Sequence, residues 1–101
     1  MTRFAYFEGS IVPMEQAKVS IAVHAFNYGT ACFEGIRAYW SDAEEQLFMF
    51  RPIEHYERLL RSARILMMSL GLTAQQMNDI TIELLRREGF REDAYFRPIA
   101  Y

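Results

Sequence analysis

Two adjacent segments with the apolar periodicity of amphipathic helices constrain the fold of this chain most strongly. The first begins at Pro52, which suits the first turn of a helix, and we expect it to end at Gly71. Its inward stripe is predicted to consist of Ile53, Tyr56, Leu59, Leu60, Ala63, Leu66 and Met67. The second begins with a capping-box sequence at Thr73–Gln76 and is expected to end at Gly89. Its inward stripe is predicted to consist of Met77, Ile80 and Leu84.

Strand-like segments precede these two helices, and one more follows them. The predicted strands are Phe4–Phe7, Ile11–Val12, Lys18–Val23, Cys32–Trp40, Leu47–Phe50 and Ala94–Tyr101. Glu8–Gly9 is expected to form a hairpin tip, and Asn27–Thr30 a tight turn or one helical turn. Ser41–Gln46 is a charged loop that joins a second hairpin, and Pro98 places the last strand at an edge or a bulge. Because strands are grouped ahead of helices, the predicted fold class is α+β, with an antiparallel sheet and two helices packed on one face.

Composition narrows the class of protein. A length of 101 residues predicts one domain, and 51% hydrophobic with 15% aromatic residues excludes a disordered chain. The net charge of -2 argues against a nucleic-acid partner. No apolar run approaches the roughly 20 residues of a membrane span. Cys32 is the one cysteine, so no intrachain disulfide forms, and a reducing cytoplasm is the expected compartment.

The two ends of the sequence differ. Met1 resembles a natural start, whereas Tyr101 lies inside the apolar stretch YFRPIAY, without a turn or cap. A terminal apolar strand exposes an unpaired edge, which domains rarely tolerate. We therefore expect these residues to be the N-terminal part of a longer protein.

The segment His24–Tyr39 carries more polar and charged residues than a core strand needs. On a strand, Phe33, Gly35 and Arg37 share one face, and the glycine lets another group approach the backbone closely. This pattern suggests one wall of a binding site. The alternative is a bulge at Gly35, with Arg37 paired to Glu34 or Glu44, and the residues alone do not separate the two interpretations.

Other arginines offer anion-binding groups. Arg58 lies beside the apolar stripe of the first helix, where a guanidinium can reach a phosphate or a carboxylate or can simply be solvated. Tyr95 and Arg97 share a face of the last strand and form either a carboxylate clamp or an ordinary cation–ring pair.

The remaining reactive residue types offer little chemistry. His24 and His55 are too few and too far apart for a metal site, and no Cys/His cluster supports zinc. Cys32, flanked by Ala31 and Phe33, is expected to be a buried inert thiol.

Three motifs in order and at matching spacing resemble a known family. NYGTACFEGIRAY, then FRPIEHYERLLRSARI, then AYFRP resemble the N-terminal small domain of the branched-chain amino acid aminotransferases, which are fold-type IV (class IV) enzymes dependent on pyridoxal 5'-phosphate. The resemblance covers nearly the whole chain. D-amino acid aminotransferases and aminodeoxychorismate lyases share the HYERLLRSA-type helix, so they remain alternatives, as does a non-catalytic ligand-binding α+β module.

The resemblance implies a role for each candidate residue. Arg58 corresponds to the arginine that binds the cofactor phosphate. Phe33, Gly35 and Arg37 correspond to the strand lining the substrate side-chain pocket, where the glycine leaves space for a branched chain. Tyr28 corresponds to a pocket tyrosine from the neighbouring subunit. The last pair, Tyr95 and Arg97, corresponds to residues that contact substrate carboxylates.

The implied reaction is amino transfer between Leu, Ile or Val and 2-oxoglutarate, in a cytoplasmic homodimer or higher homo-oligomer. The family's Schiff-base lysine lies in a second, catalytic domain beyond Tyr101. Lys18, the one lysine here, matches an early structural segment instead. The resemblance therefore implies that these 101 residues contain no catalytic residue, bind the cofactor weakly on their own and lack transaminase activity.

Overall fold

A computed structural model describes residues 3–101, and it confirms the α+β class. Its strands are β1 (Phe4–Phe7), β2 (Ser10–Pro13), β3 (Cys32–Phe33), β4 (Ile36–Ser41), β5 (Gln46–Met49), β6 (Ala94–Phe96) and β7 (Ile99–Ala100). Its helices are the 3-10 turn η1 (Met14–Gln16), α1 (His24–Tyr28), α2 (Pro52–Ile65) and α3 (Ala74–Glu88).

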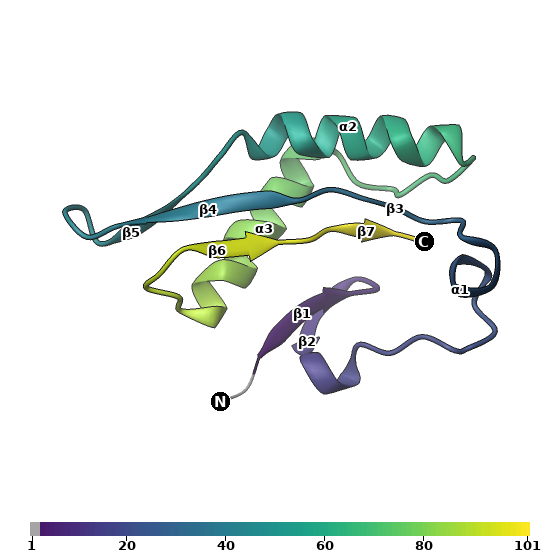
Figure 1. Cartoon of the computed structure of the whole chain (residues 1–101), viewed down its shortest axis with the longest axis horizontal. Coiled ribbons are helices and arrows are strands. Elements are labelled where there is room, and N and C mark those ends of the chain that lie inside the picture. Colours follow the sequence, from purple (N-terminus) through teal and green to yellow (C-terminus); the bar gives the residue numbers. More distant parts are fainter. Residues whose placement is uncertain (1–2) are drawn as a thin grey trace.

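The central sheet is built from two parts that lie end to end (Figure 1). One part has the antiparallel order β5-β4-β6, and the other pairs β3 with β7. The predicted strands Cys32–Trp40 and Ala94–Tyr101 are thus each divided, at Glu34–Gly35 and at Arg97–Pro98. A hydrogen bond of 3.0 Å from the Glu34 amide to the Pro98 carbonyl bridges the two breaks.

The hydrophobic core lies between the sheet and the two long helices. Ile36 and Ala100 from the sheet pack with Tyr56 and Leu59 of α2 and with Met77 of α3. Ile36 is fully buried. Because side chains alternate along a strand, every second residue from Cys32 to Ala38 faces this core, and the others face away from it. Both helices therefore cover one face of the sheet, as predicted.

The N-terminal hairpin packs beside α3 and is separate from the central sheet. Phe7 pairs with Ser10 in the register, so Glu8 and Gly9 form the predicted tip, both with positive φ. The Phe4 amide donates a 2.5 Å hydrogen bond to the carboxylate of Glu88 at the end of α3. This contact ties the first strand to the second long helix.

Helix α2 ends earlier than predicted. The expected stop was Gly71, but Met67 adopts a left-handed conformation with φ 63. The Met67 amide donates to the Arg64 carbonyl at 2.9 Å, and the Met68 amide to the Ala63 carbonyl at 2.8 Å. These two bonds form a Schellman motif with methionine in the position usually taken by glycine, and they terminate the helix. As a result Leu66 is exposed and Met67 is 96% exposed, so the prediction that both face inward was wrong.

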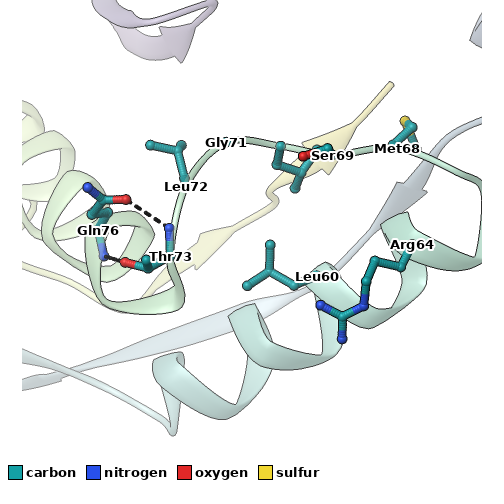
Figure 2. Close-up of a pocket in the computed structure, with 9 residues that line it drawn as sticks. Leu60, Arg64, Met68, Ser69, Gly71, Leu72, Thr73 and Gln76 are labelled. Atoms are coloured by element: carbon teal, nitrogen blue, oxygen red, sulfur yellow. Dashed lines mark hydrogen bonds between the residues drawn. The ribbon is translucent and has the colours of Figure 1, made fainter.

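The ends of α3 agree with the sequence. The Thr73 hydroxyl accepts from the Gln76 amide, and the Gln76 side chain accepts from the Thr73 amide, as Figure 2 shows. This reciprocal pair is the predicted capping box. Gly89 ends the helix in the left-handed conformation with φ 68.

One predicted strand does not form. Lys18–Val23 is an irregular segment with a turn in which the Val23 amide donates to the Ser20 carbonyl. No neighbouring strand within residues 3–101 pairs with it, and alternation of apolar residues does not produce a strand without such a partner. The expected helical turn at Asn27–Thr30 is present as the end of α1, which Gly29 terminates with φ 70.

Among the described helices, none combines the length and the apolar character needed to cross a membrane.

Candidate functional site

One cluster of predicted site residues lies on the face of the sheet that the helices leave open. The Arg97 guanidinium donates a 2.9 Å hydrogen bond to the Tyr95 hydroxyl and lies 4.5 Å from the centre of the Phe33 ring. Arg37 lies 5.9 Å from the centre of the Tyr95 ring, because Arg37 and Tyr95 are register partners on β4 and β6. We call Phe33, Arg37, Tyr95 and Arg97 the open-face cluster; all four side chains are exposed.

Gly35 belongs to the same face and makes room for one member of the cluster. A Cβ atom at position 35 would lie 3.0 Å from the Tyr95 Cζ atom and still closer to its hydroxyl oxygen. The space left by the missing side chain is therefore filled by Tyr95 in this structure. Glycine at position 35 sets how closely the Tyr95 ring approaches the β3–β4 backbone.

The two arginines of the open-face cluster lack carboxylate partners within residues 3–101. The alternative in which Arg37 pairs with Glu34 or Glu44 is therefore not the observed arrangement. Aromatic rings contact both guanidinium groups instead, and apart from the Arg97 donor used on Tyr95 their N–H donors remain available to an anion.

A second cluster forms on the helix-covered face around Glu34. The Arg58 Nε atom donates to Glu34 Oε2 at 2.7 Å, and Arg58 Nη2 donates to Oε1 at 2.6 Å. His55 Nδ1 lies 2.8 Å from the same Oε1 atom. Glu34 is 5% exposed whereas Arg58 is 62% exposed, so a buried carboxylate meets a guanidinium that still faces solvent.

In this Glu34 cluster, the carboxylate and the guanidinium each stabilise the charged form of the other. The hydrogen bond from Arg58 is the main cause that lowers the pKa of Glu34, with a smaller contribution from His55 and an opposing effect of burial. The same bond raises the pKa of Arg58. Burial, and then the negative charge of Glu34, raise the pKa of the Cys32 thiol. Cys32 is only partly buried, whereas a buried thiol was expected, and the raised pKa disfavours its reactive thiolate form.

Sequence reasoning considered Glu34 only as a partner of Arg37 and excluded His55 as a metal ligand, so it did not predict their contacts in this cluster. The sequence nevertheless contained a signal for each residue. Glu34 occupies an inward position of the strand, and an inward carboxylate requires a partner. His55 and Arg58 are three residues apart on α2 and therefore lie on the same side of the helix. What the sequence did not reveal was that this side of α2 faces Glu34.

A shallow depression of about 310 Å³ adjoins the Glu34 cluster. Its lining consists of Phe50, Arg51, Glu54, His55, Arg58 and Arg61. Glu54 accepts a 2.8 Å hydrogen bond from Arg51, so the two carry one ion pair. The arginines outnumber the acidic group of the lining, and this composition suits an anion.

The two clusters share one segment of backbone. β3 pairs with β7 alone, and β4 meets β5 only from Ala38 onward. Within the described chain, residues 33–36 therefore have a strand partner on one side only. Glu34 and Gly35 in this segment lie on opposite faces, so the two clusters share this stretch of backbone.

Tyr28 lies apart from the other candidates. It is on α1, which Figure 1 places beyond the end of β3, and its described ring contact is with His24 at 4.6 Å between centroids. Tyr28 is 74% exposed. The structure brings Phe33, Gly35, Arg37, Tyr95 and Arg97 together and leaves Tyr28 outside that group.

A larger depression, about 410 Å³, lies between α2 and the loop that leads to α3 (Figure 2). Leucine and methionine side chains line much of it, including Leu60, Met68 and Leu72. None of the candidate site residues lines it, so the candidate site consists of the two clusters. In residues 3–101 no group of three or more His, Cys, Asp or Glu side chains is arranged to hold a metal ion.

Comparison with known proteins relates this arrangement to a family. No protein-family model matches the chain. It is 58% identical over 98 residues to a "Probable branched-chain-amino-acid aminotransferase" from Aquifex aeolicus. The aligned region covers 97% of this chain and 32% of that protein. It is 34% identical over 98 residues to the "Branched-chain-amino-acid aminotransferase" of Escherichia coli, covering 97% of the chain and 31% of that protein.

The chain is related to the branched-chain-amino-acid aminotransferases. The crystal structure of such an enzyme from Thermoproteus uzoniensis with norvaline superimposes with a TM-score of 0.94 at 42% identity, over 100% of this chain and 33% of that one. The enzyme from Thermobaculum terrenum in its PLP form gives 0.82 at 37% identity, over 91% and 30%. The chain thus spans about a third of the length of the aminotransferases it matches.

Proposed function

We propose that this chain forms the small domain of a branched-chain aminotransferase, in which it holds the cofactor phosphate and selects the substrate. The observation that carries the proposal is the pair of cationic sites on opposite faces of the sheet: Arg58 beside the Glu34 carboxylate, and Arg37 with Arg97 on the open face. An amino acid bound to a phosphorylated cofactor carries two kinds of anionic group, phosphate and carboxylate. Two separate cationic sites match that requirement.

The residues at the Glu34 cluster fit pyridoxal 5'-phosphate. Arg58 uses two donors on Glu34 and keeps others free, and it lines the depression together with Arg51 and Arg61. When bound, this cofactor supplies the electron sink that lets an amino group move between carbon skeletons. In this proposal, Arg58 binds the phosphate and so fixes the position of the cofactor relative to the sheet.

The open-face cluster is the proposed substrate wall. Phe33 and the ring of Tyr95 offer apolar surface for a branched side chain, and Gly35 sets the depth of that surface. Arg97 and the Tyr95 hydroxyl, hydrogen-bonded at 2.9 Å, offer donors to a carboxylate. Both features on one wall would serve leucine, isoleucine and valine as well as glutamate, the amino acid formed from 2-oxoglutarate.

The reacting amine is proposed to come from a second domain, so that this chain alone is inactive. Lys18 is exposed in the irregular segment after η1 and is not a member of either cluster. We also propose that the protein is cytoplasmic and forms a homodimer; exposed apolar side chains around α1 support the dimer. These are Val19, Ile21, Phe26 and Tyr28. In such a dimer, Tyr28 would reach the pocket of the partner subunit.

A chimera tests the function. This chain replaces the matching third of the Aquifex aeolicus relative, and transamination of leucine with 2-oxoglutarate is measured. We expect activity, and we expect Arg58→Ala to weaken pyridoxal 5'-phosphate binding about 30-fold or more, because it removes charge-assisted hydrogen bonds worth about 2–3 kcal/mol. Arg86→Ala, which removes one exposed positive charge from α3, is the matched control. Equal cofactor affinity in the two variants contradicts the phosphate assignment.

A further inference from the structure

The function proposed above leaves one buried charged group unexplained, the carboxylate of Glu34. Burying a carboxylate is unfavourable unless it is paired and hydrogen-bonded. Glu34 is 5% exposed and accepts from Arg58 at both oxygens, with His55 as a further neighbour of Oε1. Both partners come from one side of α2. The cost of burying this charge suggests a role beyond stability, because an apolar residue would fill the same space without that cost.

The contact geometry determines which donors of Arg58 remain available. An arginine carries five N–H donors: one on Nε and two on each terminal nitrogen. The Nε donor and one Nη2 donor are used on Glu34, which leaves one on Nη2 and two on Nη1. One donor on Nη2 and one on Nη1 lie at the far end of the guanidinium plane, away from the buried carboxylate, while the other Nη1 donor points back along the side chain. These two far-end donors form a second fork that can bind a phosphate with two parallel hydrogen bonds.

Arg58 needs such a constraint because it is mostly solvent-exposed. Its side chain is 62% exposed, so packing fixes little of it. A free arginine side chain has about 2 kcal/mol of rotamer entropy, which an anion would have to overcome on binding. The paired bonds to Glu34 fix the plane of the guanidinium before any anion arrives.

His55 holds the carboxylate in turn. Because an ionised carboxylate only accepts hydrogen bonds, the Nδ1 atom of His55 must be the donor in the 2.8 Å contact with Oε1. This assigns the Nδ1 proton and fixes the ring orientation. His55 also lines the depression beside Arg58, so the carboxylate, the imidazole and the guanidinium form one connected unit at its wall.

We propose that Glu34 is a positioning residue for the phosphate site: it fixes the guanidinium of Arg58 so that its free fork faces the depression, with His55 as the second support. The inference rests on the proposed function, since it takes Arg58 as the phosphate-binding group. It adds a role for two residues that do not themselves contact the phosphate.

Charge and geometry predict opposite effects of removing this carboxylate. A neutral residue at position 34 leaves more net positive charge beside the depression, which by itself strengthens binding of an anion. Loss of the fixed guanidinium weakens it. The positioning role therefore predicts weaker phosphate binding in spite of the more favourable charge, and the sign of the change separates the two effects.

The test uses the full 101-residue chain, labelled with 15N, and two probes. Inorganic phosphate and 4'-deoxypyridoxine 5'-phosphate, which has no aldehyde to react with Lys18, are titrated while the Arg58 Nε–H resonance is followed by NMR. We expect Glu34→Gln to weaken binding of both probes about tenfold, as loss of an orienting partner typically does, and to shift that resonance. Glu45→Gln is the matched control, because it removes the same charge from an exposed pair with Arg91.

Two more variants keep the result interpretable. Glu34→Asp retains the charge but shortens the side chain by one methylene, so it cannot keep both bonds, and we expect it also to weaken binding. In an Arg58→Ala background, Glu34→Gln is expected to cause no further loss, because Glu34 acts through Arg58.

The outcomes distinguish the two hypotheses. If Arg58→Ala leaves binding of both probes unchanged, the phosphate assignment fails, and the role of Glu34 falls with it. If Arg58→Ala weakens binding but Glu34→Gln matches the control or binds more tightly, only the positioning role is overturned. A loss that persists in the Arg58→Ala background likewise shows that Glu34 acts on overall structure and not on the direction of the guanidinium.

Discussion

The arginines on the two faces of the sheet around residues 33–36 are held by different kinds of contact. On the helix-covered face, Arg58 is bound through two nitrogens by the buried carboxylate of Glu34. On the open face, Arg37 and Arg97 contact aromatic rings. The first arrangement fixes a direction at the cost of part of the positive charge, whereas the second keeps the charge and permits movement. A cofactor phosphate that stays in place suits the first arrangement, and substrates of different shapes suit the second.

The largest effect should come from the core that separates these faces. Ile36→Ala removes a fully buried side chain between the sheet and α2, and we expect it to lower the free energy of unfolding by about 2–5 kcal/mol. Tyr39→Ala, on the open face, should lower it by less than about 1 kcal/mol. Urea denaturation measures both values. Similar losses in the two variants would contradict the assignment of one face as core and the other as free surface.

A smaller effect is expected from removing the guanidinium of Arg97, one of the two arginines in the open-face cluster. In the chimera, Arg97→Ala should lower kcat/KM for glutamate about 10- to 100-fold, because a hydrogen bond to a charged group contributes about 1.5–3 kcal/mol. The value for leucine should fall less than about threefold, since leucine has no second carboxylate for the guanidinium to bind. Steady-state kinetics with both substrates checks this. Equal losses on the two substrates would show that Arg97 does not recognise the distal carboxylate.

Gly35→Ala should affect the open face alone. The added methyl group overlaps the Tyr95 hydroxyl, so the ring must move, and we expect kcat/KM of the chimera to fall about tenfold through the altered wall. The free energy of unfolding should change by less than about 1 kcal/mol, because the substitution faces away from the core. Kinetics and the NMR resonances of the Tyr95 ring report the two effects. Unchanged resonances would mean that Tyr95 does not occupy the space at Gly35.

The smallest effect concerns the pH dependence of stability. The folded state lowers the pKa of Glu34, chiefly through Arg58, so its charge stabilises the fold above the unfolded glutamate pKa of about 4.3. That contribution is lost as the pH falls through the lower folded-state pKa. Glu34→Gln should therefore be less stable than the wild type by about 1 kcal/mol at neutral pH, and the difference should vanish at the acid end.

Urea denaturation at a series of pH values measures this difference. Glu83→Gln is the control, since its partner Arg87 lies 3.8 Å away in an exposed pair on α3. Its curve should run parallel to that of the wild type. A Glu34→Gln curve that also runs parallel would show that the ion pair with Arg58 contributes nothing to stability.

Local signals in the sequence predicted the elements well. The capping box at Thr73 and the terminating glycine at Gly89 involve bonds between residues close in the chain, so their outcome depends little on the rest of the fold. The end of α2 was missed because a methionine, Met67, took the left-handed position that glycine usually occupies. The segment Lys18–Val23 had the alternation of a strand, but a strand also requires a partner, and alternation carries no information about partners.

The same contrast between local and long-range contacts applies to the candidate site. Motif spacing selected Arg58, Gly35 and the pair of Tyr95 and Arg97 as candidates, and the structure places Arg58 against Glu34 on one face of the sheet and the others on the opposite face. Motif spacing did not reveal that Glu34 binds Arg58, because that contact joins residues 24 positions apart on different elements.

The order of residues was enough to specify most of the helices and strands, the apolar face of each strand, and the side chains that can bind anions. Those properties follow from periodicity, capping and the chemistry of single residues. The packed molecule was needed to show that one arginine is fixed by a buried carboxylate while two others rest against aromatic rings. The orientation of a charged side chain depends on which distant groups share its desolvated surroundings, and the packing of α2 against the sheet brings those groups together.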